Sequence, residues 1–244
     1  MPKSIRAVCV PLLPLVLSGC AFVQTAKTAE VLLVETGEDF HGDEVKASNG
    51  EKWLGLYVTK DSSLLAESTL TVRRVFDPVI DEDERKPTGK SVSVGRREKP
   101  VFLVKNAVML RQGEATTVYQ VEHDEALSFG RKALVTLKLS GRTYQLKVVS
   151  QKRRLPVADG LLPSDAKLLF TSGSSTQTLH SLKNNDDDAC WYLLWAGDVD
   201  GDGKLDLYLS LDGYNFEQRV LFLSSQAKAG NLVSKVAEFV MTGC

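Results

Sequence analysis

Four aspartates near the end of the chain have the spacing of a metal-binding loop. Residues 198–206 read Asp-Val-Asp-Gly-Asp-Gly-Lys-Leu-Asp. Carboxylates at positions 1, 3, 5 and 9 of a loop that turns at a glycine in position 6 can converge on one hard cation, and the carbonyl oxygen of position 7 adds a further ligand. Such oxygen ligands suit calcium better than zinc. The sequence therefore predicts a structural calcium ion held by Asp198, Asp200, Asp202, Asp206 and the main-chain carbonyl of Lys204.

The segments that flank this loop distinguish two classes of calcium site. An EF-hand needs a bidentate glutamate at position 12 and two flanking helices, whereas position 12 is Leu209 and residues 191–196 and 205–211 have the composition of strands. Residues 197–207 instead resemble the calcium-carrying hairpins of FG-GAP or VCBS-type repeats, in which two strands bracket a DxDxDG loop. The resemblance covers one hairpin and does not imply a complete propeller.

Two questions about this loop stay open at the level of sequence. A metal-free acidic turn between two strands is the alternative to a calcium site. Further ligands could come from Asp212 or from one of Asp186, Asp187 and Asp188. Without a glutamate at position 12, we expect an extracellular-type affinity, with a Kd of about 10⁻⁴ to 10⁻³ M.

The first twenty residues have the three-part order of a secretion signal. Lys3 and Arg6 give a positive start, residues 7–17 are apolar, and two small residues precede Cys20. Eleven apolar residues interrupted by two prolines are too short for a membrane span, which takes about twenty. We therefore interpret the segment as a targeting signal and not as a permanent transmembrane helix.

The run Leu17-Ser18-Gly19-Cys20 resembles the lipobox of bacterial lipoproteins. The resemblance implies that residues 1–19 are a signal peptide, that Cys20 is lipidated and acylated as the first mature residue, and that residues 20–30 form a tether. Because Ala21 stands where an aspartate would retain the protein at the inner membrane, it also implies outer-membrane attachment, facing the periplasm or the cell surface. A cleaved signal with a chance cysteine, or a cytosolic apolar N-terminus, is the alternative.

Two of the four cysteines remain once Cys9 leaves with the signal and Cys20 is lipidated. In an oxidising compartment, Cys190 and Cys244 are then expected to form a disulfide. Two free thiols or a metal-binding pair are the alternatives. A disulfide would fasten the calcium hairpin and the C-terminus into one unit.

Charge and motif spacing argue against several functions. Removal of Lys3 and Arg6 with the signal leaves 28 basic against 31 acidic residues, and the dense basic runs at 96–99 and 152–154 are too short for a nucleic-acid surface. Residues 88–91 resemble the tail of a phosphate-binding loop but lack its first glycine, and residues 172–175 are not a nucleophile elbow. We therefore expect neither nucleic-acid binding nor a recognisable catalytic motif, although enzyme activity stays undecided.

The body of the chain is predicted to be mostly β, as an antiparallel sandwich or barrel-like fold. Short stretches rich in Val, Leu, Thr and Tyr alternate with turn residues, at 30–35, 53–59, 69–75, 101–104, 116–121, 134–139, 144–149, 167–171, 177–180, 191–196, 205–211 and 220–223. The Asn49-Gly50 and Ser140-Gly141 pairs predict hairpin turns, and residues 77–89 predict an exposed acidic loop. For the end of the chain we favour a strand over a helix.

Turn residues between 153 and 163 suggest a division into an N-terminal β domain (31–155) and a C-terminal β unit with the calcium loop (160–244), unless the two are continuous. Together these features predict a lipid-anchored cell-envelope protein that acts as a binding or structural module. Its partners would be the membrane, through Cys20, and an envelope protein or glycan. The alternative is an envelope hydrolase with a dispersed site, for which a cleft should bring His123 or His180 beside acidic residues.

Overall fold

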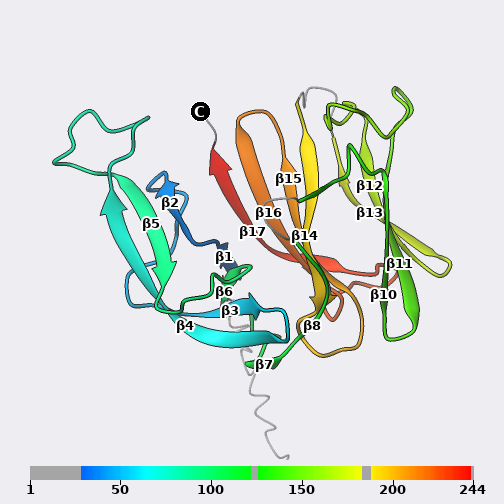
Figure 1. Ribbon diagram of the computed structural model, residues 1–244, viewed down its shortest axis with the longest axis horizontal. Coiled ribbons are helices and arrows are strands. Elements are labelled where there is room, and N and C mark those ends of the chain that lie inside the picture. Colours follow the sequence, from blue (N-terminus) through cyan, green and yellow to red (C-terminus); the bar gives the residue numbers. More distant parts are fainter. Residues whose placement is uncertain (1–28, 122–125, 183–187, 243–244) are drawn as a thin grey trace, which may run out of the picture.

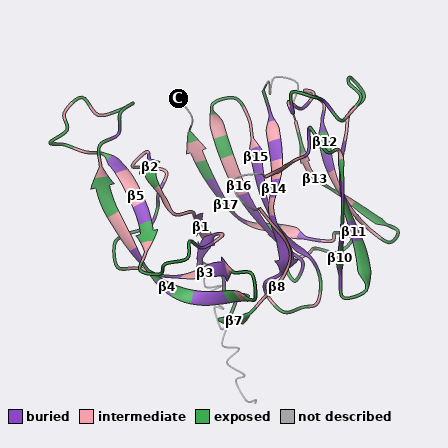
Figure 2. Ribbon diagram, viewed as in Figure 1, coloured by how far each residue is buried: buried purple, intermediate pink, exposed green. Residues whose placement is uncertain are grey.

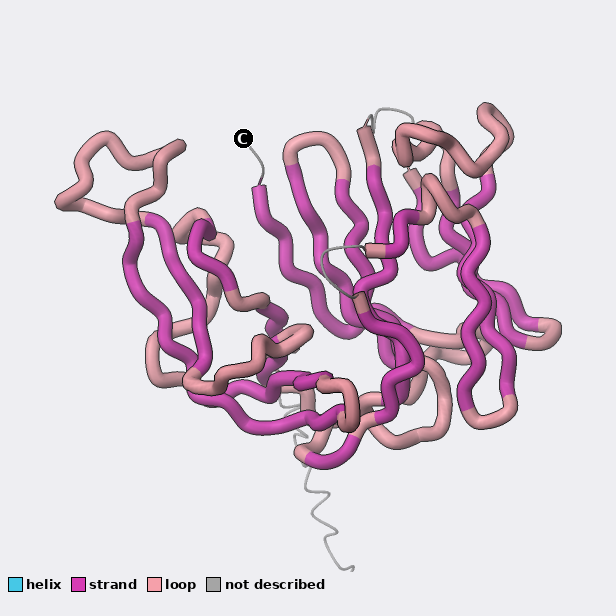
Figure 3. Tube along the Cα trace, in the orientation of Figure 1, coloured by secondary structure: helices cyan, strands magenta, loops and turns pink. Residues whose placement is uncertain are grey.

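The computed structural model describes residues 29–121, 126–182 and 188–242, and these residues form seventeen strands and no helix (Figures 1 and 3). Every strand pairing is antiparallel. The predicted antiparallel β class is therefore confirmed. The strands form three sheets, which we call the first, central and four-stranded sheets.

The first sheet uses the strands from the N-terminal part of the chain. In spatial order it consists of β1 (Leu32–Val34), β6 (Leu103–Lys105), β3 (Lys52–Val58), β4 (Ser63–Val75), β5 (Gly89–Val94) and β2 (Gly37–Phe40), and β7 (Gly113–Glu114) pairs with β4. The long strand β4 pairs with β3 over its first half and with β5 over its second half. Strands β1 and β2 consequently lie at the two edges of this sheet.

The four-stranded sheet is a simple meander. It consists of β10 (Leu134–Leu139), β11 (Arg142–Val149), β12 (Lys167–Ser172) and β13 (Ser175–Ser181). Ser140 and Gly141 join the first two strands with φ angles of 48° and 75°, so the hairpin predicted there is confirmed. Strands β11 and β12 pair from Tyr144 to Val149. The sheet thus continues across the boundary expected between residues 155 and 160.

The central sheet collects the C-terminal strands with two short strands from the middle of the chain. It consists of β17 (Ser234–Thr242), β16 (Phe216–Leu223), β15 (Asp206–Asp212), β14 (Cys190–Asp198) and β8 (Thr116–Gln120), and β9 (Leu127–Ser128) pairs with β14. The strand favoured at the end of the chain is confirmed as β17. Its neighbour β16 turns back directly from β15.

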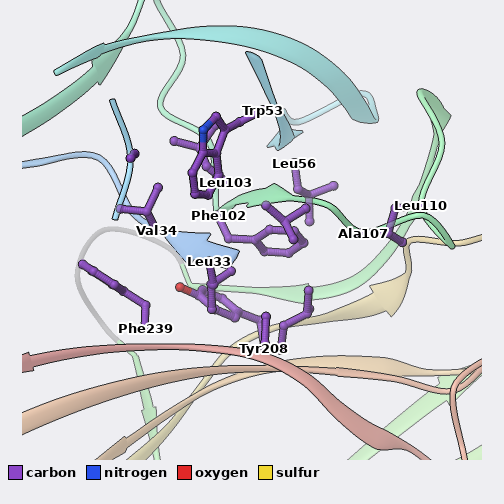
Figure 4. Packing of buried hydrophobic residues seen from close by; sticks show 14 of the residues in the cluster. Leu33, Val34, Trp53, Leu56, Phe102, Leu103, Ala107, Leu110, Tyr208 and Phe239 are labelled. Atoms are coloured by element: carbon purple, nitrogen blue, oxygen red, sulfur yellow. The ribbon is translucent and has the colours of Figure 1, made fainter. Parts of the chain in front are cut away.

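Both faces of the central sheet are buried along its middle strands β14 and β15 (Figure 2). In β15, Tyr208 packs into the core shared with the first sheet, where its ring centroid lies 5.2 Å from that of Phe102 (Figure 4). Leu207 and Leu209 point the other way, into the core shared with the four-stranded sheet. Because each fully buried side chain of this size contributes about 1.5–3 kcal/mol, the central sheet holds the other two sheets together.

A β-bulge in β14 allows its two tryptophans to pack into different cores. Trp191 and Leu193 face the four-stranded sheet, and the pairing register then shifts between Leu193 and Trp195. An extra residue in one strand reverses the alternation of side chains beyond it. Trp195 accordingly faces the first sheet, where its indole nitrogen donates to Thr117 Oγ1 at 2.8 Å.

Two local predictions differ from the structure. The hairpin expected at Asn49-Gly50 is wrong: β2 and β3 do not pair, and Gly50 N donates to Leu70 O instead. The segment 77–89 does connect β4 to β5, but it is not uniformly solvated. Asp77 is buried beside His41, whereas Val79 and Ile80 are 57 % and 56 % exposed.

Candidate functional site

The acidic loop 198–206 joins β14 to β15 at one end of the central sheet. Gly197 and Asp206 are the last paired residues of the two strands, so the predicted bracketing by strands is confirmed. Gly201 and Gly203 have φ angles of 79° and 75°. Residues with a Cβ rarely adopt this region, and the two glycines therefore let the chain turn tightly enough to bring its aspartates together.

Three of the four predicted aspartates meet at one point. Asp198, Asp200 and Asp206 each offer a carboxylate oxygen, and these oxygens lie within 4.8 Å of one another. Three carboxylate oxygens at this separation can hold a metal ion. The chemistry of the donor set fits a hard cation, because all three ligands are oxygen atoms.

The electrostatics of this site favour the arrival of positive charge. Asp206 is fully buried and accepts hydrogen bonds from Val199 N (2.9 Å) and Ser224 N (2.7 Å). Burial, together with the negative charge of Asp200, raises the pKa of Asp206 to about 7. Burial also raises the pKa of Asp200. No described lysine or arginine forms an ion pair with any of the three carboxylates.

Asp202 and Lys204 have other contacts in the structure. Asp202 Oδ1 accepts from Lys204 N at 2.8 Å and from Ser224 Oγ at 2.9 Å, and its Oδ2 lies 3.3 Å from Lys204 Nζ. The structure thus does not bring Asp202 into the group of three. Coordination by Asp202 and by the carbonyl of Lys204 stays a prediction.

Two serines that the sequence analysis did not single out complete the surroundings of the loop. Ser224 and Ser225 follow β16 directly. Ser224 Oγ donates to Asp206 Oδ1 at 3.0 Å as well as to Asp202, and Ser225 Oγ donates to Asp200 Oδ2. Their only signal in the sequence is a serine pair after an apolar strand, and pairing between β15 and β16 is needed to place them here.

The additional ligands considered from sequence lie elsewhere. Asp212 is at the opposite end of β15, where it pairs across from Cys190, so Asp188 belongs to that distant end as well. Neither residue can complete the shell around Asp206. Asp186 and Asp187 lie outside the described residues.

A second group of charged side chains gathers at the far end of β15 around Arg219. The guanidinium of Arg219 donates to Glu35 Oε2 (3.3 Å), Asp212 Oδ1 (3.1 Å) and Glu217 Oε2 (2.6 Å), and also to Ser210 Oγ (2.5 Å). Burial would lower the pKa of Arg219, but the charges of Glu35 and Asp212 raise it. Burial raises the pKa of both Glu35 and Asp212 despite the neighbouring arginine.

Asp212, Glu217 and Arg219 of this group line an open groove of about 890 Å³ over β14–β16, together with Arg131 and Lys132. None of the described histidines lines the groove. His180 instead packs edge-on against Trp191, with ring centroids 5.0 Å apart, and His123 lies outside the described residues. The arrangement required for the hydrolase alternative is therefore not formed by the described histidines.

The remaining predicted site residues are outside the described part of the chain or are untested by it. Cys20 with the whole signal, and Cys244, lie beyond residues 29–242. Cys190 forms no disulfide among the described residues, and its Sγ lies 3.9 Å from Gly160 O. Its pairing with Cys244 stays a prediction. Across the described residues, the structure contains no helix long and apolar enough to cross a membrane.

Comparison with known proteins finds no relative of this chain. No protein-family model, curated protein or solved structure matches the chain.

Proposed function

We propose that this protein is a lipid-anchored component of the cell envelope, in which a calcium ion at Asp198, Asp200 and Asp206 stabilises a β body that acts as a binding or structural module. The observation that carries the calcium part of the proposal is the group of three carboxylates, which converge without an ion pair to any described basic side chain. Like charges this close repel one another unless a cation lies among them. A bound cation would therefore stabilise the fold.

Calcium fits this loop better than magnesium does. Calcium accepts six to eight oxygen ligands in flexible geometry, whereas magnesium demands a near-ideal octahedron and releases its water reluctantly. The loop offers carboxylates of unequal burial, with Asp206 buried and Asp200 half-buried. Water and the Lys204 carbonyl would supply further ligands, and Asp202 would join if its side chain turned from Ser224.

The ion would fasten three parts of the central sheet. The loop ends β14 and begins β15, and Ser224 and Ser225 connect it to the turn after β16. Calcium concentrations outside the cytoplasm suit a site with a Kd of about 10⁻⁴ to 10⁻³ M. The site thus has a structural role in this proposal, and the binding surface lies elsewhere on the body.

The anchor part of the proposal rests on the Leu17-Ser18-Gly19-Cys20 motif. A lipid at Cys20 would hold the body at a membrane, with the outer membrane as the proposed location and an envelope protein or glycan as the proposed partner. Cys20→Ser should release the protein from the membrane fraction and abolish acyl labelling. Unchanged membrane retention and labelling in that variant would disprove the anchor.

The calcium site is tested by thermal unfolding in EDTA and in calcium. At ten times the Kd, a ligand that binds only the folded state adds about 1.4 kcal/mol of stability, so the melting temperature should rise. Asp200→Ala should abolish the rise, whereas Asp61→Ala, at an exposed aspartate in the β3–β4 turn, should keep it. If millimolar calcium leaves the melting temperature of the unmodified protein unchanged, the site does not bind calcium.

A further inference from the structure

The groove of about 890 Å³ lies over four neighbouring strands of the central sheet, β9, β14, β15 and β16 (Figure 1). Ser128, Tyr192, Ser210 and Arg219 form a row of cross-strand neighbours along its floor. On the same face of β15, two residues before Ser210, Tyr208 packs against the first sheet. None of the described residues of the first sheet lines the groove. The groove therefore begins where the first sheet stops covering the central sheet.

The middle of the groove is apolar. Tyr192 and Leu194 of β14 line it, together with Ala126, and the ring of Tyr192 is half-buried. Burial raises the pKa of Tyr192 to about 12, and the positive charge of Arg131 opposes this rise, so the guanidinium lies near the phenol. A tyrosine presents an apolar ring with a polar tip. This strip can therefore cover one apolar face of a ligand.

The side of the groove formed by β9 and the turn after it offers hydrogen-bond donors. Ser128, Arg131 and Lys132 line this side, which we call the donor wall. Arg131 and Lys132 are exposed, and neither forms an ion pair with a described carboxylate. Lys132 N donates to Ser128 O at 2.9 Å and so fixes the turn. The donor wall thus keeps two charged donors for a ligand.

The opposite side, on β15 and β16, offers acceptors. Asp212 and Glu217 line it, and we call it the acceptor wall. Asp212 accepts from Ser210 Oγ, Gln218 N and Arg219 Nη1, and all three bonds end on Oδ1. Glu217 binds Arg219 through Oε2. Among the described residues, Asp212 Oδ2 and Glu217 Oε1 therefore remain available to a ligand.

The two walls and the apolar strip define the chemistry of the ligand. The charges that line the groove balance, because three are basic and three are acidic, namely Arg131, Lys132, Arg219, Asp159, Asp212 and Glu217. A hydroxyl group both donates and accepts, so a ligand rich in hydroxyls can use both walls without a charge of its own. A sugar ring combines such hydroxyls at its rim with an apolar C–H face. Pockets of about 300–1,000 Å³ hold small organic ligands, and a short oligosaccharide is of this size.

We infer that this groove binds an uncharged oligosaccharide, one ring of which lies over Tyr192 while its hydroxyl groups form hydrogen bonds with the donor wall and the acceptor wall. The inference rests on the proposed role as a binding module, for which it names the site and the class of ligand. A peptide that carries one basic and one acidic side chain could also use both walls. The test must therefore separate a sugar from such a peptide.

Saturation-transfer NMR of the purified full chain with four uncharged trisaccharides tests the ligand class. They are built from α-linked glucose, β-linked glucose, mannose and N-acetylglucosamine, so they share this chemistry and differ in shape. At least one should bind saturably at millimolar concentration. Because salt screens interactions between charges, the affinity for an uncharged sugar should change less than twofold as salt increases. Absence of binding by all four, or tighter binding of an end-blocked lysine–valine–glutamate peptide, would overturn the inference.

Substitutions in the donor wall locate the site with the sugar that binds most tightly. Arg131→Ala with Lys132→Ala should weaken binding at least tenfold, because both substitutions remove hydrogen bonds from charged donors. The matched control is Lys138→Ala with Arg142→Ala, which makes the same change at two exposed positions of β10 and β11 and should alter binding less than twofold. Equal losses in the two pairs would overturn the assignment of the sugar to this groove.

Substitutions of Tyr192 test the stacked ring. Tyr192→Ala should weaken binding at least tenfold, whereas Tyr192→Phe keeps the ring and should change binding less than threefold. Unchanged binding by Tyr192→Ala would overturn the inference. Since Arg131 and Lys132 are exposed, their double variant should keep the melting temperature of the unmodified protein, and it carries the test alone if Tyr192→Ala does not fold. The calcium-dependent melting shift and the Cys20-dependent membrane retention do not depend on these outcomes, so they report separately on the proposed function.

Discussion

Both ends of β15 gather carboxylates, at Asp206 on one side and at Asp212 on the other. At the Asp206 end, three aspartates converge with hydrogen bonds from backbone and serine groups as their only described compensation. At the Asp212 end, Arg219 binds three carboxylates directly. One end thus carries its counter-charge in the chain, and the other leaves room for a cation from solution.

The contrast explains why the two ends have different roles in our proposals. A fixed arginine supplies its positive charge whichever cations the solution contains, whereas a carboxylate group without a basic partner depends on the cations in solution. Glu35 directly follows β1 of the first sheet, and Arg219 lies in β16 of the central sheet. The Arg219 end therefore joins two sheets through charges that the chain itself supplies, and in our proposal the Asp206 end responds to calcium.

Arg219→Met should have the largest effect, because it leaves Glu35 and Asp212 without their positive partner while keeping most of the side-chain volume. The side chain of Arg219 is 15 % exposed. Removal of one member of a largely buried ion pair costs about 3–5 kcal/mol. Urea denaturation should show this loss in both EDTA and calcium.

Arg219→Lys is the control for charge alone. Lysine keeps the positive charge but cannot donate in several directions from one plane, so its stability should lie between those of the unmodified protein and Arg219→Met. A stability for Arg219→Met equal to that of the unmodified protein would contradict the structural importance of this end.

Ser224→Ala should have a smaller effect that depends on the metal. Its hydroxyl donates to Asp202 and Asp206, and loss of such bonds to charged acceptors costs about 1.5–3 kcal/mol. In the presence of calcium, Ser224→Ala should lose less stability, because the carboxylates would then bind the ion. Thermal unfolding in EDTA and in calcium measures both values, with Ser62→Ala in the exposed β3–β4 turn as the control. Equal losses in the two conditions would show that calcium does not replace the serine.

The sequence was informative wherever the determining residues are close together in the chain. The acidic loop spans nine residues, and its glycines and three converging aspartates lie within that span. Strands β10, β11 and β14 follow from local alternation and composition in the same way. These features depend on short-range geometry, which the spacing of residues encodes.

The features that the sequence analysis missed depend on pairings between distant segments. Glu35 and Arg219 are separated by 184 positions, and nothing near either residue indicates the other. The Asn49-Gly50 pair has the composition of a hairpin turn, but β3 pairs with β4 and β6 instead of with β2. Local turn chemistry permits a hairpin, and the sheet topology decides whether one forms.

The ion pair between His41 and Asp77 gives the smallest expected effect on stability. It joins one positive and one negative group, and the positive group can lose its proton, which the guanidinium of Arg219 does not. His41 Nδ1 lies 2.5 Å from Asp77 Oδ2, with side chains 12 % and 3 % exposed. The hydrogen bond to Asp77 raises the pKa of His41, and nearby Glu44 and Asp43 favour the charged ring as well. The same hydrogen bond lowers the pKa of Asp77.

Since the pKa of His41 is higher in the folded than in the unfolded protein, its contribution is complete below about pH 6.5 and is lost as the pH rises through the folded-state value. Asp77 behaves in the opposite sense, so its contribution is lost only as the pH falls through its lowered pKa. Urea midpoints should therefore decline between pH 5.5 and 8.5, and His41→Asn should decline less. Because the other two histidines are the same in both proteins, the difference between the two declines isolates His41. Identical declines would mean that this pair, unlike the Arg219 end, contributes no charge-dependent stability.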